Sequence, residues 1–205
     1  MALCDVSEAP TSAPRSVKLE TQRGRRSFDQ SSQGFVSRNL VSMSIRLRPA
    51  TIEDSPILKT WDFDADVGYS GGEDDNYDWD YELPRLVSWR EFLIAEVDAC
   101  PIGMVVLIDA LREESHYWGE DAPEDAWALD IWIGSEIHRS KGFGTQMMKK
   151  SLARCFETHR ASCVLIDPLQ SNKRAIEFYR RLGFIEVGPR RFGNDDCLVM
   201  SIGPS

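Results

Sequence analysis

The sequence predicts an α/β (α+β) domain in which helices flank one mixed sheet. Three observations support this prediction. The 205 residues are 42% hydrophobic and 28% charged, which is enough apolar material for one sizeable core. From Ser44 onward, strand-like runs alternate with helical periodicity. Their order is β-α-loop-β-β-loop-β-α-β-α-β-β, which favours a mixed sheet with covered faces.

Residues 1–42 differ in composition from the rest of the chain. They are rich in Ser, Arg and Gln, and their apolar residues follow no lasting period. We therefore predict a disordered N-terminal extension over 1–42 and a folded domain over 43–205. Three interpretations of the extension stay open: no role, a gene start placed upstream of Met43, or a transit peptide, against which Asp5 and Glu8 argue.

The first part of the domain should contain a strand, a helix and an irregular loop. Residues 45–48 alternate between apolar and basic and are followed by Pro49. Thr51 is the expected cap of a helix over 52–61. Residues 62–82 break all periodicity and are rich in acidic and aromatic residues, which predicts an irregular loop that can include a helical turn.

Three strands and a second acidic loop are expected in the middle of the domain. The strands cover 92–97, 102–108 and 127–133, with a hairpin turn at Asp98 and the loop over 112–126. Alternate residues of a strand lie on opposite faces. In the third strand one face therefore holds Trp127, Leu129, Ile131 and Ile133, and the other holds Asp130 and Trp132.

Two helices and three strands should complete the domain. Gly183 stands at the usual C-terminal glycine position of the second helix. In chain order we expect a helix over 144–158, a short buried strand over 163–166, a helix capped by Ser171 or Asn172, and strands over 184–187 and 197–202.

Composition excludes several classes of function. A formal charge of -9 argues against nucleic-acid binding and favours a cationic partner. No stretch of about 18 apolar residues is present, so no membrane partner is expected. The five cysteines form no CxxC pair and the three histidines are isolated, so neither a disulfide framework nor a metal site is predicted. These features are typical of a cytoplasmic protein, while import by residues 1–42 stays open.

The segment Arg139-Ser-Lys-Gly142-Phe-Gly144 is the most informative stretch. It lies between a strand and a helix. Its glycines let backbone N–H groups approach a ligand, and the helix N-terminus and the two cations favour an anion. This pattern predicts a pyrophosphate site, with an ordinary strand-to-helix turn as the alternative.

These residues resemble the coenzyme A motif of the GNAT acetyltransferase superfamily, Gln/Arg-x-x-Gly-x-Gly/Ala. The second block, from Asp167 to Phe184, is similar to the family pattern Asn-x-x-Ala-x-x-x-Tyr-x-x-x-Gly-Phe, and the resemblance spans about 44–202. Within the superfamily the chain is most similar to aminoglycoside 6'-N-acetyltransferases. The shared features include Pro-Ile-Gly in the hairpin, Trp-Gly-Glu in the acidic loop, Leu-Asp before the coenzyme motif, and Asp-Pro-x-x-Ser-Asn.

The resemblance implies a GNAT-like, mostly antiparallel mixed sheet with a splayed cleft between the fourth and fifth strands. It implies acetyl-CoA as the acetyl donor and no metal. The pantetheine arm would meet the strand, and the phosphates would meet the turn and the second helix. The implied cofactor-binding residues are Ile131, Trp132, Ile133, Arg139, Ser140, Lys141, Gly142, Phe143, Gly144, Thr145 and Asn172.

The resemblance also assigns roles near the cleft. Asp130 is the implied base that takes a proton from the acceptor amine, or else a carboxylate paired with an Arg. Tyr179 is the implied proton donor to the leaving thiolate, or else a core aromatic. Asp167 matches an acceptor-binding aspartate, or else closes a turn before Pro168. The expected acceptor-binding residues of the acidic loop are Trp118, Glu120 and Asp121, with a solvated acidic surface as the alternative.

The sequence thus predicts an acetyl-CoA-dependent N-acetyltransferase, a monomer or homodimer, that acetylates a primary amine of a cationic, aminoglycoside-like small molecule. Two alternatives stay open. The acceptor can be a siderophore hydroxylamine, a polyamine or a protein N-terminus. The domain can also be an acyl-CoA-binding module without turnover.

Overall fold

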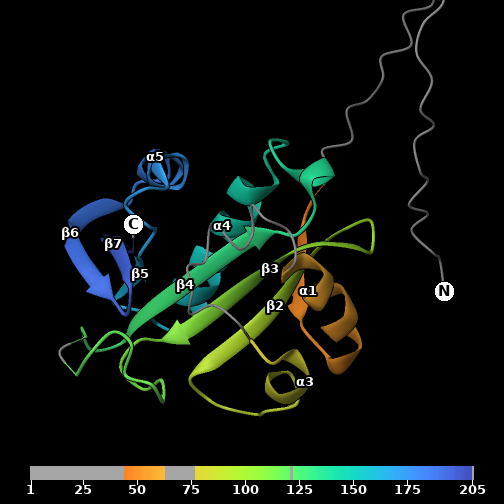
Figure 1. Ribbon diagram of the computed structural model, residues 1–205, viewed down its shortest axis with the longest axis horizontal. Coiled ribbons are helices and arrows are strands. Elements are labelled where there is room, and N and C mark those ends of the chain that lie inside the picture. Colours follow the sequence, from red (N-terminus) through yellow and green to blue (C-terminus); the bar gives the residue numbers. More distant parts are fainter. Residues whose placement is uncertain (1–43, 63–76, 121, 205) are drawn as a thin grey trace, which may run out of the picture. The chain divides into compact units, whose positions relative to one another are not determined.

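The computed structural model describes residues 44–62, 77–120 and 122–204. Seven strands form one sheet in the order β1-β2-β3-β4-β5-β7-β6 (Figure 1). The strands are β1 (Arg46–Pro49), β2 (Arg90–Val97), β3 (Cys100–Asp109), β4 (Ala126–Ile133), β5 (Cys163–Ile166), β6 (Ile185–Phe192) and β7 (Asp195–Ile202). Only β4 and β5 are parallel among these neighbours. The predicted mixed, mostly antiparallel sheet is confirmed.

The helices follow the predicted order. They are η1 (Ile52–Asp54), α1 (Ser55–Asp62), α3 (Trp79–Glu82), η2 (Glu136–His138), α4 (Phe143–Ala153), the π-helical turn η3 (Arg154–Thr158) and α5 (Lys173–Arg181). The helix expected over 52–61 therefore begins as a 3-10 turn, and the one expected over 144–158 ends as a π turn. The predicted extension over 1–42 and most of the first acidic loop lie outside the described residues, and the domain boundary stays a prediction.

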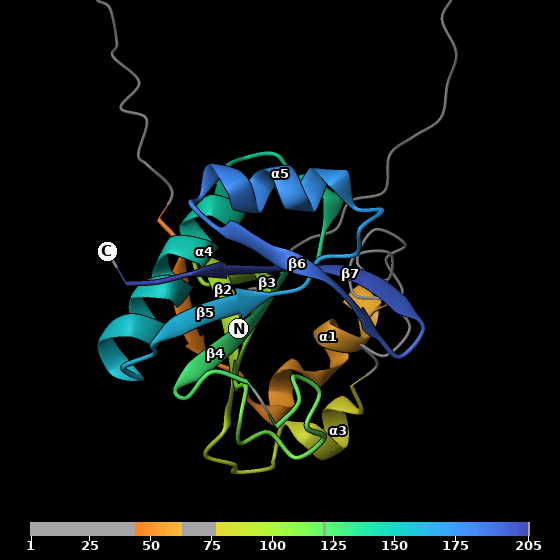
Figure 2. The same cartoon turned by 90° about the vertical axis from the view of Figure 1, so that its left-hand side faces the viewer.

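Helices cover both faces of the strands β1 to β4, as Figure 2 shows. On one face α4 contributes Phe143, Met147 and Met148 to the largest apolar cluster, which includes the Leu129 side of β4. On the opposite face α1 and α3 contribute Leu58, Trp61 and Trp79, which pack with Trp132. The predicted alternation of β4 is confirmed, and Asp130 belongs to the face that α1 and α3 cover.

A glycine fixes the distance between α1 and the end of β4. A Cβ placed on Gly134 would lie 2.0 Å from the Trp61 ring. No side chain larger than hydrogen fits there, so α1 packs directly on the backbone that follows β4. The covered face of β4 is thereby closed at this end.

Candidate active site

The edge of β4 that faces β5 is only partly paired. The ladder between the two strands has the register pairs Ala126–Cys163, Trp127–Val164 and Ala128–Leu165. Beyond Ala128, β4 continues to Ile133 against β3, while β5 pairs with β7. In the described part of the chain, those peptide groups of 129–132 that point away from β3 therefore have no ladder partner on this edge. Their N–H and C=O groups suit an extended, amide-containing ligand arm.

The turn before α4 leaves the backbone N–H groups at the start of the helix accessible to an anion. Ser140 and Gly142 have φ values of 60° and 81°, and Gly142 is the N-cap of α4. No side chain caps this helix, and a Cβ on Gly142 would meet nothing within 4 Å. The first N–H groups of α4 thus face an open approach, which favours phosphate binding.

Charged side chains hold and border this turn. Arg139 Nε donates to the Ile133 carbonyl oxygen at 3.3 Å, which ties the turn to the end of β4. Lys141 is exposed, and together with burial its charge lowers the pKa of His138. The turn is therefore cationic.

The remaining residues predicted to hold the cofactor have mixed environments. Phe143 is buried in the core, whereas Gly144 and Thr145 are half-buried. Ile131 and Ile133 pack toward α4 and Trp132 packs toward α1 and α3, so this strand offers its backbone edge rather than its side chains. Asn172 Oδ1 accepts from the Ala175 N–H at 3.0 Å, so Asn172 caps α5. The open edge and the uncapped turn fit the two ends of a coenzyme A-type molecule.

Two aspartates and two tyrosines influence one another electrostatically. Burial raises the pKa of Tyr179, and the charges of Asp130 and Asp167 raise it further. The Tyr179 hydroxyl therefore keeps its proton at neutral pH. Burial also raises the pKa of Tyr117, again with contributions from Asp167 and Asp130. All four groups are thus close enough to interact electrostatically.

Tyr117 holds Asp167 directly. Its hydroxyl donates to Asp167 Oδ2 at 2.6 Å, and its ring stacks on Phe192 with the centroids 4.3 Å apart. Burial raises the pKa of Asp167 even though this hydrogen bond opposes the shift. The acidic loop is thus joined to the end of β5 and to the β6–β7 hairpin.

The two neighbouring aromatic residues of the acidic loop lie in different environments. Trp118 is 4% exposed and packs in the cluster behind β5 and β7. Tyr117, which the sequence analysis did not select, is 39% exposed and bonds Asp167. Glu120 is exposed, and Asp121 lies outside the described residues. The acceptor-binding roles of Trp118, Glu120 and Asp121 stay predictions.

Several loop carboxylates have partners within the protein. Glu113 is buried and accepts from Ser115 and from the Tyr117 N–H, which shapes the loop. Arg85 pairs with Glu82 and Glu114, and it lowers the pKa of Glu114. Glu82, Glu113 and Glu114 therefore have structural partners within the chain, and no acceptor is needed to account for their charges.

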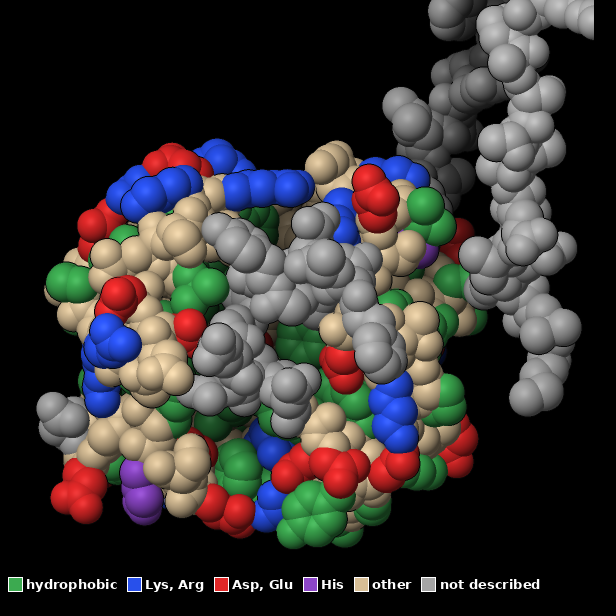
Figure 3. Space-filling view, in the orientation of Figure 1, with side chains coloured by type: hydrophobic (Ala, Val, Ile, Leu, Met, Phe, Trp, Pro, Cys, Tyr) green, Lys and Arg blue, Asp and Glu red, His purple; other side chains and the backbone are tan. Residues whose placement is uncertain are grey.

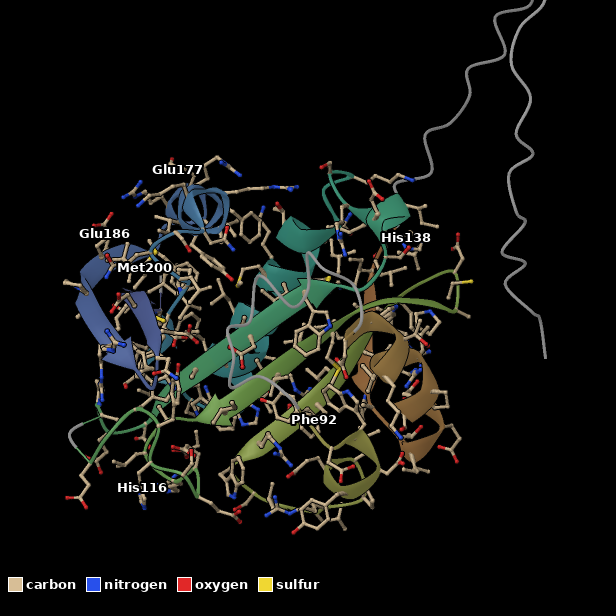
Figure 4. All side chains as sticks on the ribbon, in the orientation of Figure 1. Phe92, His116, His138, Glu177, Glu186 and Met200 are labelled. Carbon is tan, nitrogen blue, oxygen red and sulfur yellow. The ribbon has the colours of Figure 1, made fainter. Side chains whose placement is uncertain are left out.

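The described residues contain no other evident chemistry. No group of three His, Cys, Asp or Glu among them could hold a metal ion. Figure 4 shows His116 at the tip of the acidic loop and His138 between β4 and α4. Burial raises the pKa of the Cys155 thiol to about 12, as expected for a core cysteine. No helix in the described part is long and apolar enough to cross a membrane.

Comparisons with known proteins agree with this geometry. A family model described as an acetyltransferase (GNAT) domain matches residues 51–192. An aminoglycoside N(6')-acetyltransferase type 1 of Klebsiella pneumoniae is 26% identical over 152 residues, which cover 71% of this chain and 76% of that protein. A kanamycin resistance protein of Rhizobium radiobacter is 27% identical over 78 residues, 38% of this chain and 72% of that one.

Solved structures share the fold. The aminoglycoside acetyltransferase AAC(6')-Ib in complex with coenzyme A matches with a TM-score of 0.70 and 23% identity, over 78% of this chain and 95% of that one. A spermidine N-acetyltransferase from Vibrio cholerae, in complex with CoA and spermine, matches with a TM-score of 0.64 and 18% identity, over 78% and 95%. The seven-stranded sheet with its open β4 edge is therefore a known architecture.

Proposed function

Because the chain belongs to the acetyltransferase (GNAT) domain family and is an acetyl-CoA-dependent acetyltransferase, we propose that it acetylates a primary amine of a cationic small molecule, with an aminoglycoside-like acceptor favoured. One observation carries this proposal. The Tyr117 hydroxyl holds Asp167 at 2.6 Å at the end of β5, and the charges of Asp130 and Asp167 both raise the pKa of Tyr179. Two carboxylates attract ammonium groups, and a protonated tyrosine provides an acid.

Bound acetyl-CoA supplies the acetyl group as a thioester. The peptide edge of residues 129–132 and the turn from Arg139 to Gly144 would hold its arm and its phosphates. Both features are built from backbone groups, so they need no rearrangement of side chains to accept the ligand. The Arg139 bond to the Ile133 carbonyl keeps the turn in place at the end of β4.

Asp130 is the proposed base. An alkylammonium has a pKa well above 7 and has no lone pair, so it must lose a proton before its nitrogen can form the new C–N bond. Asp130 takes this proton directly or through water. As the C–S bond breaks, the Tyr179 hydroxyl gives its proton to the sulfur. The nitrogen of the new C–N bond still carries a second proton, which passes to the tyrosinate left on Tyr179, directly or through water. Tyr179 is thereby restored, and the one net proton of the reaction stays on Asp130 until it is released to solvent.

Asp167 is proposed to hold a second ammonium of the acceptor. It is half-buried at the end of β5, and Tyr117 fixes one of its oxygens at 2.6 Å. A charge-assisted hydrogen bond from the acceptor to such a carboxylate positions the reacting amine. A polyamine presents the same charges, so it is the second candidate acceptor; the chain shares its fold with a spermidine acetyltransferase.

A thiol-release screen tests the proposal. Purified protein and acetyl-CoA are mixed in parallel with aminoglycosides, polyamines and peptides. We expect the highest rates with aminoglycosides that carry a 6'-amine. The matched control is an aminoglycoside with a hydroxyl at this position, which should give background release. Acetyl-CoA binding without release on any amine would favour a non-catalytic module, and faster release with peptides would contradict the small-molecule acceptor.

A further inference from the structure

One face of α5 lies against the turn before α4. A Cβ placed on Gly144 would lie 3.7 Å from Phe178 Cζ and 3.9 Å from Ile133 Cδ1. Phe178 therefore reaches the first turn of α4 directly above the end of β4. Residues four apart share one face of a helix, so Arg174 lies one turn before Phe178 on the same side of α5.

Arg174 makes a hydrogen bond across this boundary. Its Nη2 donates to Ser140 Oγ at 3.3 Å. Ser140 has a φ of 60°, which non-glycine residues adopt infrequently. The turn thus holds the Ser140 hydroxyl toward α5, and the guanidinium of Arg174 contacts the turn that leads into α4.

The other cations of α5 are placed differently. Figure 3 shows Lys and Arg side chains along the outer surface over α5, where Lys173, Arg174, Arg180 and Arg181 are exposed. Arg180 pairs with Glu177 and Glu186, which Figure 4 shows at the outer side of α5 and on β6. Among the hydrogen bonds of the described residues, Arg174 provides the link from an α5 cation to the turn.

We propose that Arg174 clamps the diphosphate of acetyl-CoA by exchanging the Ser140 hydroxyl for a phosphate oxygen. This inference rests on the cofactor site described above. The exchange replaces a bond to a neutral hydroxyl with a bond to an anion, and charge-assisted hydrogen bonds are roughly twice as strong as neutral ones. The planar guanidinium can also offer two donors to one phosphate. Arg174 would thereby fix α5 over the bound cofactor, and it takes no part in the chemical step.

Calorimetric titration with acetyl-CoA tests the clamp. We expect Arg174→Ala to weaken binding about tenfold, because one charge-assisted bond is lost. Arg181→Ala is the matched control, since it removes the same charge from the same exposed helix, and it should change the affinity less than about twofold. Thermal unfolding of each variant checks that the fold is intact.

Two analogues locate the contact. Acetylated dephospho-CoA lacks the 3'-phosphate but keeps the diphosphate, and acetylpantetheine lacks all phosphates. The penalty of Arg174→Ala should persist with the first analogue and disappear with the second. A penalty that disappears with the dephospho analogue overturns the assignment to the diphosphate, and equal losses in both Arg variants overturn the clamp in favour of a general charge effect.

The clamp and the proposed function fail in different ways. If the wild type takes up acetyl-CoA and Arg174→Ala binds it equally well, the clamp alone is overturned. If the wild type takes up no acetyl-CoA, the proposed function and the clamp are overturned together.

Discussion

Asp130 is the only carboxylate of β4, and its proposed role as the base predicts a large effect on turnover. We expect Asp130→Asn to lower kcat by about 10²- to 10⁴-fold, because the variant cannot take a proton from the acceptor ammonium. The fold should be retained, since the shape of the side chain is preserved. Asp196→Asn, an exposed position on β7, is the control. Thiol release measured across pH checks this, and an unchanged rate at every pH would assign the base to another group.

Asp167 predicts a pH dependence of acceptor binding. Burial raises its pKa, so the negative charge is lost at a higher pH than for an exposed aspartate. As pH falls, the KM of the acceptor should therefore rise before exposed aspartates are protonated. Asp167→Asn should raise this KM roughly tenfold or more and remove that part of the pH dependence. A KM that is the same for both proteins at neutral pH would exclude Asp167 from acceptor binding.

The same substitution makes an opposite prediction for stability. A carboxylate with a raised folded-state pKa opposes folding at neutral pH, and this cost decreases as the pH falls through the folded-state pKa. Asn can still accept the Tyr117 hydrogen bond. We expect the free energy of unfolding of Asp167→Asn at pH 7 to equal or exceed that of the wild type in urea titrations. A clear loss of stability would show that the charge itself holds Tyr117.

The sequence could not predict which of two neighbouring aromatic residues in the acidic loop is buried. Tyr117 and Trp118 are adjacent, and the loop has no periodicity that assigns one of them to the interior. The structure buries Trp118 and leaves Tyr117 39% exposed, and Phe192 of the distant β6–β7 hairpin contacts both rings. A contact between residues 75 positions apart in sequence leaves no local signal. By contrast, the face of Asp130 follows from strand alternation alone.

At the scale of elements, the two glycines of the turn before α4 should respond differently to alanine. Gly142 has a φ of 81°, so Gly142→Ala should cost about 1–2 kcal/mol and lower Tm by roughly 2–8 °C. Gly144 is helical, and its added Cβ would meet only ordinary contacts at 3.7 Å and beyond. Gly144→Ala should therefore stay within about 0.5 kcal/mol of the wild type. Calorimetric scans compare the Tm values of the two variants. Equal decreases in Tm would mean that packing, rather than backbone conformation, determines the loss of stability.

The order and type of the elements could be read from periodicity, but not all of their ends. The last hairpin shows why. The sequence predicts a strand over 184–187, whereas β6 continues through Gly188 and Pro189 to Phe192. A register shift between Glu186 and Gly188 accommodates the extra backbone, and β6 is an edge strand on which a proline can be tolerated. The register shift and the edge position of β6 both depend on the strand order, which the sequence alone does not give.

At the scale of the whole molecule, the formal charge of -9 predicts a salt-dependent encounter with cationic acceptors. Raising the ionic strength from about 20 mM to about 500 mM shortens the Debye length several-fold. We expect kcat/KM for an acceptor with three or more ammonium groups to fall about tenfold. An amine with one charge is the control and should change less than about twofold. Steady-state assays over a salt series check this, and equal slopes would contradict electrostatic steering.

The parallel ladder between β4 and β5 consists of three register pairs, and it is the place where the sheet changes from its N-terminal to its C-terminal half. Such a short seam is a natural hinge, since few backbone bonds resist rocking of one half against the other. Acetyl-CoA bound along this seam would contact both halves and restrain their relative motion. Amide hydrogen exchange in β4 and β5 should therefore slow together when acetyl-CoA binds. The sheet would then be most rigid in the acetyl-CoA complex.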